Sequence, residues 1–331
     1  MRPHLLQSPT KFRGRELVMA LCTVTERHST TGAPTGGFDQ GLARKTVSTE
    51  ALVTSWRRSS DTTQTVTVQW PQQHSFYTVS TRYSPLLVIE SLRQALAVLT
   101  HTVHDIPLSH RLGWEHIRST VDPEALWAGP TSPSVELTIT HTKVKRRPGG
   151  SVHLASQVEA TRDGVALGEA ELHYTTHPPA IYNRLRGRYA DARQAFAQAL
   201  PLTPPVPPAH VGRSSVRDVV LSPTSTAHQW QLRVDTTHTV LFDHPHDHVP
   251  GMVLLEAADQ IARAEAQPQA AIPVAFDTTF HRYVEFDRPC VLTAEPVEPD
   301  AQGRSRVLVS AFQADQVVFR TTVTTEPSAT R

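Results

Sequence analysis

Residues 241–260 read LFDHPHDHVPGMVLLEAADQ, and they indicate the fold more clearly than any other segment of the chain. This segment starts as a loop dense in histidine and aspartate, and Pro250-Gly251 then opens an apolar helix, because proline is favoured at a helix start. The first turns of this helix carry one carboxylate, Glu256, among aliphatic side chains. Burying an unpaired carboxylate costs several kcal/mol or shifts its pKa. Glu256 is therefore a candidate site residue on a buried helix.

The same helix pattern occurs once more, earlier in the chain. Residues 84–94, SPLLVIESLRQ, align with residues 250–260, PGMVLLEAADQ, so that Glu90 corresponds to Glu256 and Gln94 to Gln260. Two copies with a period far longer than that of a solenoid indicate two like domains that face each other. Each domain contributes one central helix and one glutamate.

Composition and charge narrow the class of protein. A chain of 331 residues is long enough for two domains with separate cores. A net charge of +1 with 19% charged residues argues against a nucleic-acid-binding protein. Cys22 and Cys290 lie far apart in unlike contexts, so neither a disulfide framework nor a cysteine metal site is expected. No segment has the pattern of a signal peptide or a membrane span, which favours a cytoplasmic protein without membrane contact.

Strand patterns surround both helices. The helices are predicted over residues 85–104 and 250–266, each with strands before and after it, which is an α+β plan. The predicted strands lie near residues 47–56, 62–70, 111–120, 135–145, 151–161, 166–175, 216–221, 229–241, 274–284, 291–296, 306–311 and 317–325. Each half alone would leave an exposed sheet edge, so we expect the two sheets to join and the two helices to lie side by side.

The chain divides into four predicted segments. They are a poorly ordered leader over residues 1–42, a first domain over 43–178, a helical and proline-rich connector over 179–208, and a second domain over 209–327.

This plan resembles the hotdog fold, and its motifs resemble those of the A-factor biosynthesis family, whose members carry two such domains in one polypeptide. The matching segments are residues 45–56, 74–77, 85–94, 182–186, 243–260 and 282–290. The most specific of them is Asp-His-Pro followed by Asp-His-Val-Pro-Gly-Met. The resemblance implies a double hotdog in which each sheet wraps a long central helix.

The resemblance also implies an activity. It is the transfer of a β-ketoacyl chain from acyl carrier protein to the hydroxyl of dihydroxyacetone phosphate, or a similar small alcohol, in the biosynthesis of γ-butyrolactone signals. No cofactor is expected. Arg184, Arg186 and Arg188 on the connector form either a solvated basic face or a docking patch for the carrier protein.

Five residues are candidates for the catalytic centre. Glu90 and Glu256 match the two central-helix glutamates of the family, and in related hotdog dehydratases a histidine ahead of Pro-Gly forms an acid–base pair with the helix glutamate. His244 and His248 are the candidates for that histidine. The N–H of Gly251 can stabilise an oxyanion, whereas a proline occupies the corresponding position in the first half. We therefore expect the second half to supply the reacting loop and Glu90 mainly to position the substrate.

Four further residues are candidate substrate ligands: Arg93, Gln94, Asp259 and Gln260. Asp259 stands where the family usually has arginine, and it should raise the pKa of Glu256 if both acids are buried. The remaining loop histidine, His246, is interpreted as a cap of the loop. Histidine and aspartate suit zinc, but the histidines alternate within one short loop, so no metal site is expected.

Two other functions stay open at this stage. One is a hotdog dehydratase or thioesterase acting on acyl thioesters, and the other is a non-catalytic regulator that binds an acyl or lactone ligand between the domains. Dependence on an alcohol acceptor separates the transferase from the hydrolase, which needs only water.

Overall fold

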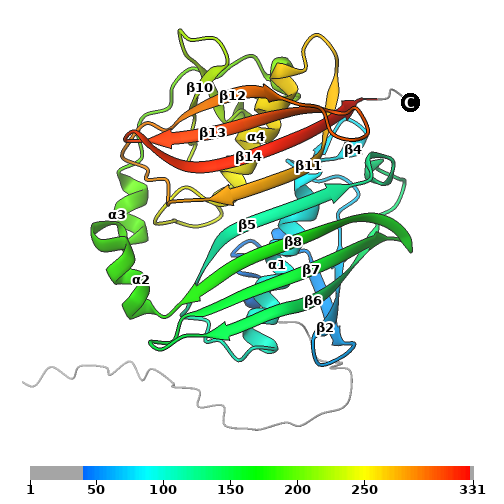
Figure 1. The fold of residues 1–331 in the computed structure, drawn as a ribbon, viewed down its shortest axis with the longest axis vertical. Coiled ribbons are helices and arrows are strands. Elements are labelled where there is room, and N and C mark those ends of the chain that lie inside the picture. The colour runs from blue at the N-terminus through cyan, green and yellow to red at the C-terminus, as the bar shows by residue number, and fades with distance from the viewer. Residues whose placement is uncertain (1–39, 329–331) are drawn as a thin grey trace, which may run out of the picture. The chain divides into compact units, whose positions relative to one another are not determined.

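The computed structural model describes residues 40–328, and all structural statements below refer to them (Figure 1). The predicted leader lies outside this part of the chain except for residues 40–42. The dominant element is one antiparallel sheet of twelve strands, in the order β1-β2-β6-β7-β8-β5-β11-β14-β13-β12-β10-β9. None of the described helices is both long and apolar enough to cross a membrane.

The first half of the chain supplies one side of this sheet. Its strands are β1 (Val53–Arg58), β2 (Thr63–Gln69), β5 (Arg111–Val121), β6 (Ser134–Arg146), β7 (Val152–Arg162) and β8 (Val165–His177). Two short strands, β3 (Thr78–Val79) and β4 (Arg82–Tyr83), form a separate ribbon. The helix α1 (Leu86–Thr102) lies between β4 and β5 in the sequence.

The second half repeats this order. Its strands are β9 (Leu221–Pro223), β10 (Gln229–Leu232), β11 (Ala271–Phe280), β12 (Val291–Val297), β13 (Ser305–Gln313) and β14 (Gln316–Pro327). The helix α4 (Gly251–Glu265) lies between β10 and β11. Between the halves, α2 (Pro179–Arg186) and α3 (Ala192–Ala197) form the predicted helical connector.

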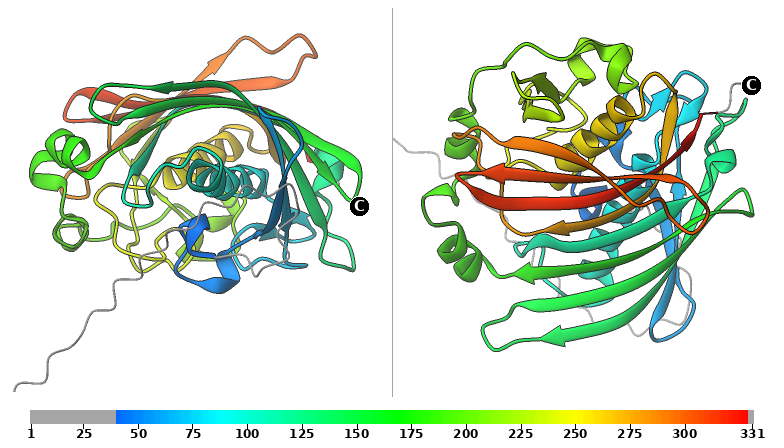
Figure 2. Two further views of the ribbon diagram at one scale, coloured as in Figure 1. Left: turned by 90° about the horizontal axis from the view of Figure 1, so that it is seen from below. Right: turned by 45° about the horizontal axis from the view of Figure 1, so that its top comes forward.

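The two halves join edge to edge at β5 and β11. These strands pair in antiparallel register from Ala275 opposite Thr120 to Thr279 opposite His116, and the strand order on the two sides mirrors this joint. Both central helices lie under the same concave face of the sheet (Figure 2). The predicted joining of the sheets and the predicted double hotdog are confirmed, while the limits of the individual domains stay a prediction.

Burial explains why these two helices sit at the centre. Every residue of α4 from Met252 to Ala262 is buried, and α1 is buried on almost every face. Each fully buried leucine or isoleucine contributes roughly 1.5–3 kcal/mol relative to exposure. The helices are therefore the core around which the sheet curves.

Two predicted strands of the second half are shorter than expected. The segment near 216–221 starts as a single 3-10 turn, Val216–Asp218, and only Leu221–Pro223 pairs in the sheet. The strand predicted over 229–241 ends at Leu232, and the chain then forms the loop that leads to α4. In the first half, likewise, Ser48–Glu50 is a 3-10 turn and the strand starts only at Val53. Turns form here in place of strands because backbone groups of these segments form hydrogen bonds with a side chain of the central helix.

A buried glutamine makes that bond in each half. Gln94 accepts the N–H of Leu52 at 2.7 Å and donates to the carbonyl of Glu50 at 2.8 Å. Gln260 accepts the N–H of Val220 at 3.1 Å and donates to the carbonyl of Asp218 at 2.7 Å. The two bonds hold the start of each half to its helix.

A buried histidine repeats in the same way. His74 accepts the N–H groups of Phe76 and Tyr77 at its Nδ1, so its proton is on Nε2, which lies 3.2 Å from the Glu50 carboxylate. His238 holds the next turn of the second half identically, with Nε2 3.2 Å from Asp218. The repeat thus extends well beyond the two helices.

A different buried histidine makes stability depend on pH. The Nδ1 of His141, on β6, lies 3.0 Å from the hydroxyl of Ser156, and the ring lies 4.4 Å from that of His104. Burial, and to a smaller extent the charge of His104, lowers the pKa of His141 to about 4.

We predict that His141→Asn flattens the pH dependence of the free energy of unfolding below pH 6.5. The unfolded imidazole takes up a proton near pH 6.5, whereas the folded one has a pKa of about 4, so stability is complete above pH 6.5 and falls through this window. The wild type should lose of order 2–3 kcal/mol more than the variant at pH 4. Urea denaturation at several pH values measures this, and equal slopes would contradict it.

Candidate active site

A cavity of about 750 Å³ opens between the two halves of the protein. It is lined by one face of α1, the start of α4, the starts and ends of neighbouring strands and the residues of the histidine loop, 243–248. Five of the candidate residues line it: Glu90, Arg93, His244, His248 and Gly251. Four do not: Gln94, Glu256, Asp259 and Gln260.

Glu90 is the acid that lines the cavity from α1. Both of its oxygens accept 2.8 Å hydrogen bonds from the guanidinium of Arg93, and Oε1 lies 3.4 Å from the amine of Lys45. Burial opposes ionisation of Glu90, but Arg93 and Lys45 outweigh it and lower the pKa to about 2. The group is thus one fixed anion faced by two cations.

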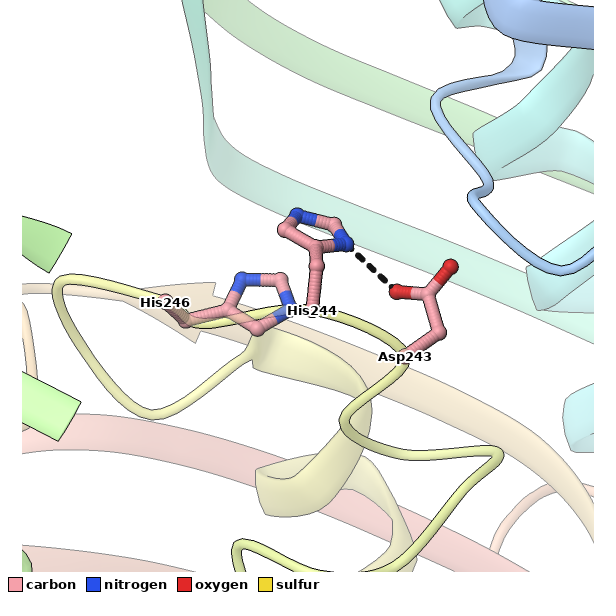
Figure 3. Close-up of side chains that lie close together, drawn as sticks. All are labelled: Asp243, His244 and His246. Atoms are coloured by element: carbon pink, nitrogen blue, oxygen red, sulfur yellow. Dashed lines mark hydrogen bonds and ion pairs between the residues drawn. The ribbon is translucent and has the colours of Figure 1, made fainter. Parts of the chain in front are cut away.

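The histidine loop carries an aspartate–histidine dyad. Nδ1 of His244 lies 2.6 Å from Oδ1 of Asp243 (Figure 3), and Oδ2 of Asp243 accepts the N–H of Thr46 at 2.8 Å. Burial raises the pKa of Asp243, but His244, Thr46 and Lys45 lower it by more, so the net shift is downward. A charged Asp243 fixes the proton of His244 on Nδ1 and leaves Nε2 free to accept a proton.

A second dyad follows at once in the sequence. Nδ1 of His248 lies 3.0 Å from Oδ1 of Asp247, whose other oxygen accepts hydrogen bonds from Tyr182 at 2.7 Å and Arg186 at 2.8 Å. Arg186 is buried and also bonds Glu285 at 2.7 and 2.8 Å. The docking role considered for Arg186 is therefore wrong, because this arginine ties the connector to the histidine loop.

His246 completes a group that could hold a metal ion. Donor atoms of Asp243, His244 and His246 all lie within 4.8 Å of one another, and the two imidazoles are adjacent (Figure 3). Burial, with the charge of His244, lowers the pKa of His246 to about 3, so it is neutral. Lys45 and Arg93 act on these same side chains and oppose a bound cation. The arrangement suits a hydrogen-bonded dyad better than a metal centre.

Gly251 is the first residue of α4 and lines the cavity. Its N–H has no partner within the helix and lies at the positive end of the helix dipole. A Cβ at this position would lie 3.1 Å from the Phe280 ring and 3.4 Å from Trp114. The residue is small because two aromatic rings pack against the helix start.

Glu256 lies outside the cavity. Its side chain is 0% exposed and binds the buried guanidinium of Arg213 through two hydrogen bonds, from Nε at 2.8 Å and from Nη2. Arg213 also donates to the carbonyl of Phe76 in the first half at 2.6 Å. Through Arg213 this ion pair joins the two halves, and Glu256 does not line the cavity.

Asp259 has a partner of its own. It is buried and accepts a 2.6 Å hydrogen bond from Arg263, one turn further along α4. Burial raises the pKa of Glu256, Asp259 raises it further as expected from the sequence, and Arg213 opposes both. An arginine at position 259 would meet Arg263 and Arg213, whereas Asp259 pairs with Arg263 and lies near Arg213.

Sequence reasoning missed three residues that line the cavity, Lys45, Asp243 and Asp247, and also Arg213, the partner of Glu256. Lys45 and Arg213 stand at equivalent places before the first strands of the two halves, each opposite its helix glutamate. The repeated Asp-His doublet of the loop was the available signal for the two aspartates.

We predict that Glu256→Gln destabilises the fold far more than Glu90→Gln does. The first change leaves Arg213 buried without its counter-ion, which costs about 3–5 kcal/mol. The second leaves Lys45 and Arg93, which line a cavity that water can enter, so a loss below about 2 kcal/mol is expected. Chemical denaturation compares them, and equal losses would contradict the placement of the two glutamates.

The chain is similar to known proteins over most of its length. A family model described as the A-factor biosynthesis hotdog domain matches residues 38–178 and 195–329. The 2-oxo-3-(phosphooxy)propyl 3-oxoalkanoate synthase of Streptomyces virginiae is 35% identical over 289 residues, which cover 87% of this chain and 97% of that protein. The synthase of the same name from Streptomyces griseus is 35% identical over 291 residues, which cover 85% and 92%.

Among solved structures, an oleoyl thioesterase (putative) from Lactobacillus plantarum is 12% identical with a TM-score of 0.49, covering 82% of this chain and 99% of that chain. The resemblance seen in the sequence motifs is confirmed by the family match. This chain belongs to the A-factor biosynthesis hotdog-domain family.

Proposed function

We propose that this protein transfers a 3-oxoacyl chain from a thioester donor to the hydroxyl of a small phosphorylated alcohol, with dihydroxyacetone phosphate as the expected acceptor. One observation carries the proposal. The Asp243–His244 dyad of the second half and the cationic group around Glu90 of the first half line the same cavity. The synthase name of the relatives supports this choice of substrates.

The base of the reaction is His244. Its free Nε2 takes the proton of the acceptor hydroxyl as the oxygen attacks the thioester carbon, and Asp243 stabilises the imidazolium that forms. The new C–O bond forms, the C–S bond breaks, and the same proton passes to the departing thiolate. His248, held by Asp247, is the second candidate for that last transfer.

The oxyanion of the tetrahedral intermediate needs a donor, and the N–H of Gly251 is the candidate. It lies at the start of α4 in the cavity wall, where the helix dipole favours negative charge. A donor of this kind typically contributes about 2.7–4 kcal/mol to the transition state. The corresponding helix start of the first half has Pro85, which lacks an N–H.

The phosphate of the acceptor suits the group around Glu90. Lys45 and Arg93 line the cavity beside Glu90, and the nearby Asp243 is already held by His244 and Thr46. Around Glu256, by contrast, two acids face two arginines, and the group is closed. We therefore assign to Glu90 the role of fixing the two cations, and to Glu256 a role in the fold.

Acyl carrier protein is the proposed donor. Arg184 and Arg188 on the connector are exposed, next to Leu185 and Tyr189, which line the cavity. An acidic carrier could dock there and direct its prosthetic group inward. A cytoplasmic location, with neither nucleic acid nor membrane as partner, stays a prediction from the sequence.

We predict that ester forms from 3-oxoacyl carrier protein only when dihydroxyacetone phosphate is present, as read by mass spectrometry. His244→Asn should lower kcat by about 10²- to 10⁴-fold, because it removes the base while keeping a small polar side chain. His228→Asn is the control, since His228 lies outside the cavity and pairs with Glu265. Free acid formed without acceptor would favour a thioesterase, and binding without turnover would favour a regulator.

We predict further that Lys45→Met weakens the preference for dihydroxyacetone phosphate over dihydroxyacetone by tenfold or more, because one charge-assisted contact to phosphate is lost. Lys143→Met, on an exposed part of β6 outside the cavity, is the matched control. An unchanged ratio of kcat/KM for the two alcohols would remove Lys45 from the acceptor site.

A further inference from the structure

Tyr77 differs from every other tyrosine of the chain. Five of the six hydroxyls have a hydrogen-bond partner: those of Tyr83, Tyr174, Tyr182, Tyr189 and Tyr283. Within residues 40–328 no partner is found for the hydroxyl of Tyr77, although the residue is only 2% exposed. A buried hydroxyl normally has a partner. Because Tyr77 lines the cavity, a ligand can supply it.

The ring of Tyr77 is held in a fixed position. Its backbone N–H bonds Nδ1 of His74 at 3.2 Å, and its carbonyl accepts the N–H of Ser84, at the start of α1, at 2.6 Å. The rings of His74 and Phe76 pack on it edge-on, with centroids 4.8 and 4.9 Å away. A side chain so fixed cannot turn to find another partner, and its hydroxyl is presented to the cavity.

Tyr77 shares the cavity with apolar side chains as well as with the charged group around Glu90. The corresponding residue of the second half, one turn after His238, is Leu241. Leu241 lines the same cavity together with Leu96, Met252 and Leu254. These side chains suit an acyl chain, and Tyr77 adds one hydrogen-bond donor among them.

Glu90 does not accept a hydrogen bond from the Tyr77 hydroxyl. Its oxygens already accept hydrogen bonds from Arg93 and Gln94 and lie near Lys45. Burial, followed by the charges of Glu90 and Glu256, raises the pKa of Tyr77, so the phenol keeps its proton and can donate.

We propose that the Tyr77 hydroxyl donates a hydrogen bond to the 3-oxo oxygen of the acyl chain and so selects 3-oxoacyl donors over saturated ones. A ketone oxygen that leaves water for this cavity gives up a hydrogen bond and needs a donor, which Tyr77 supplies. A saturated chain offers nothing in return and leaves the hydroxyl unpaired. This inference rests on the proposed transfer reaction and names the feature of its donor that is recognised.

The test compares Tyr77→Phe with the wild type on two donors of equal chain length, one 3-oxo and one saturated, at saturating acceptor. We expect kcat/KM for the 3-oxo donor to fall roughly 10- to 100-fold and that for the saturated donor to change less than twofold. Tyr83→Phe is the matched control, since it removes a buried hydroxyl bonded to the carbonyls of Pro71 and Gln72, outside the cavity.

Two results would overturn the proposal. Equal losses on both donors would mean that Tyr77 serves the thioester carbonyl or the fold, and no loss on either would mean that its hydroxyl contacts no substrate. A spectroscopic readout supports the kinetics: the stretching frequency of an isotope-labelled 3-oxo carbonyl should be lower when bound to the wild type than to Tyr77→Phe.

The proposal can be judged even if the transfer reaction fails. Calorimetry with unreactive amide analogues of 3-oxoacyl and acyl pantetheine measures binding alone, and the wild type should prefer the 3-oxo analogue by a ratio that Tyr77→Phe abolishes. Absence of ester with every acceptor would count against the proposed function only. Equal affinity of the wild type for both analogues would count against Tyr77.

Discussion

Each central helix buries a carboxylate, and a buried carboxylate is stable only with cations beside it. Arg213 meets this need for Glu256 with two hydrogen bonds, and its third contact, to the carbonyl of Phe76, crosses from one half to the other. Lys45 and Arg93 meet it for Glu90. Breaking the sealed pair of Glu256 and Arg213 costs about 3–5 kcal/mol, so this pair fixes how the second half sits on its helix and against the first half.

The two helix glutamates have different cation partners, and this difference leaves a single site in a fold of two similar halves. Around Glu256 the charges are balanced by Arg213 and, for Asp259, by Arg263, and the group is sealed. Around Glu90 two cations line a cavity of about 750 Å³. The histidine loop of the second half lines the same cavity, so neither half has a complete site alone.

Much of the fold could be predicted from the sequence, because the repeated apolar helix with its Glu-x-x-x-Gln spacing is a local pattern. Glu256 was expected to act in catalysis, but only Glu90 lines the cavity. The sequence could not separate the two glutamates, since they have the same local pattern and only their distant partners differ. Arg213 lies 43 positions from Glu256 in the chain, and Thr46 lies 197 from Asp243, so no periodicity could pair them. Strands β9 and β10 are shorter than predicted because the backbone of neighbouring residues is bonded elsewhere. The N–H of Val220 donates to Gln260 on α4, and that of Leu241 donates to His238.

The central claim is that a fold of two similar halves holds a single site. The most direct measurement is the number of unreactive 3-oxoacyl-pantetheine amide molecules bound per chain, from native mass spectrometry and calorimetry. We expect one molecule per chain, which no longer binds when His246→Trp fills the cavity beside the histidine loop and still binds when Glu256 and Arg213 are replaced together by Met and Leu. Two molecules per chain, or loss of binding only in the double variant, would contradict it.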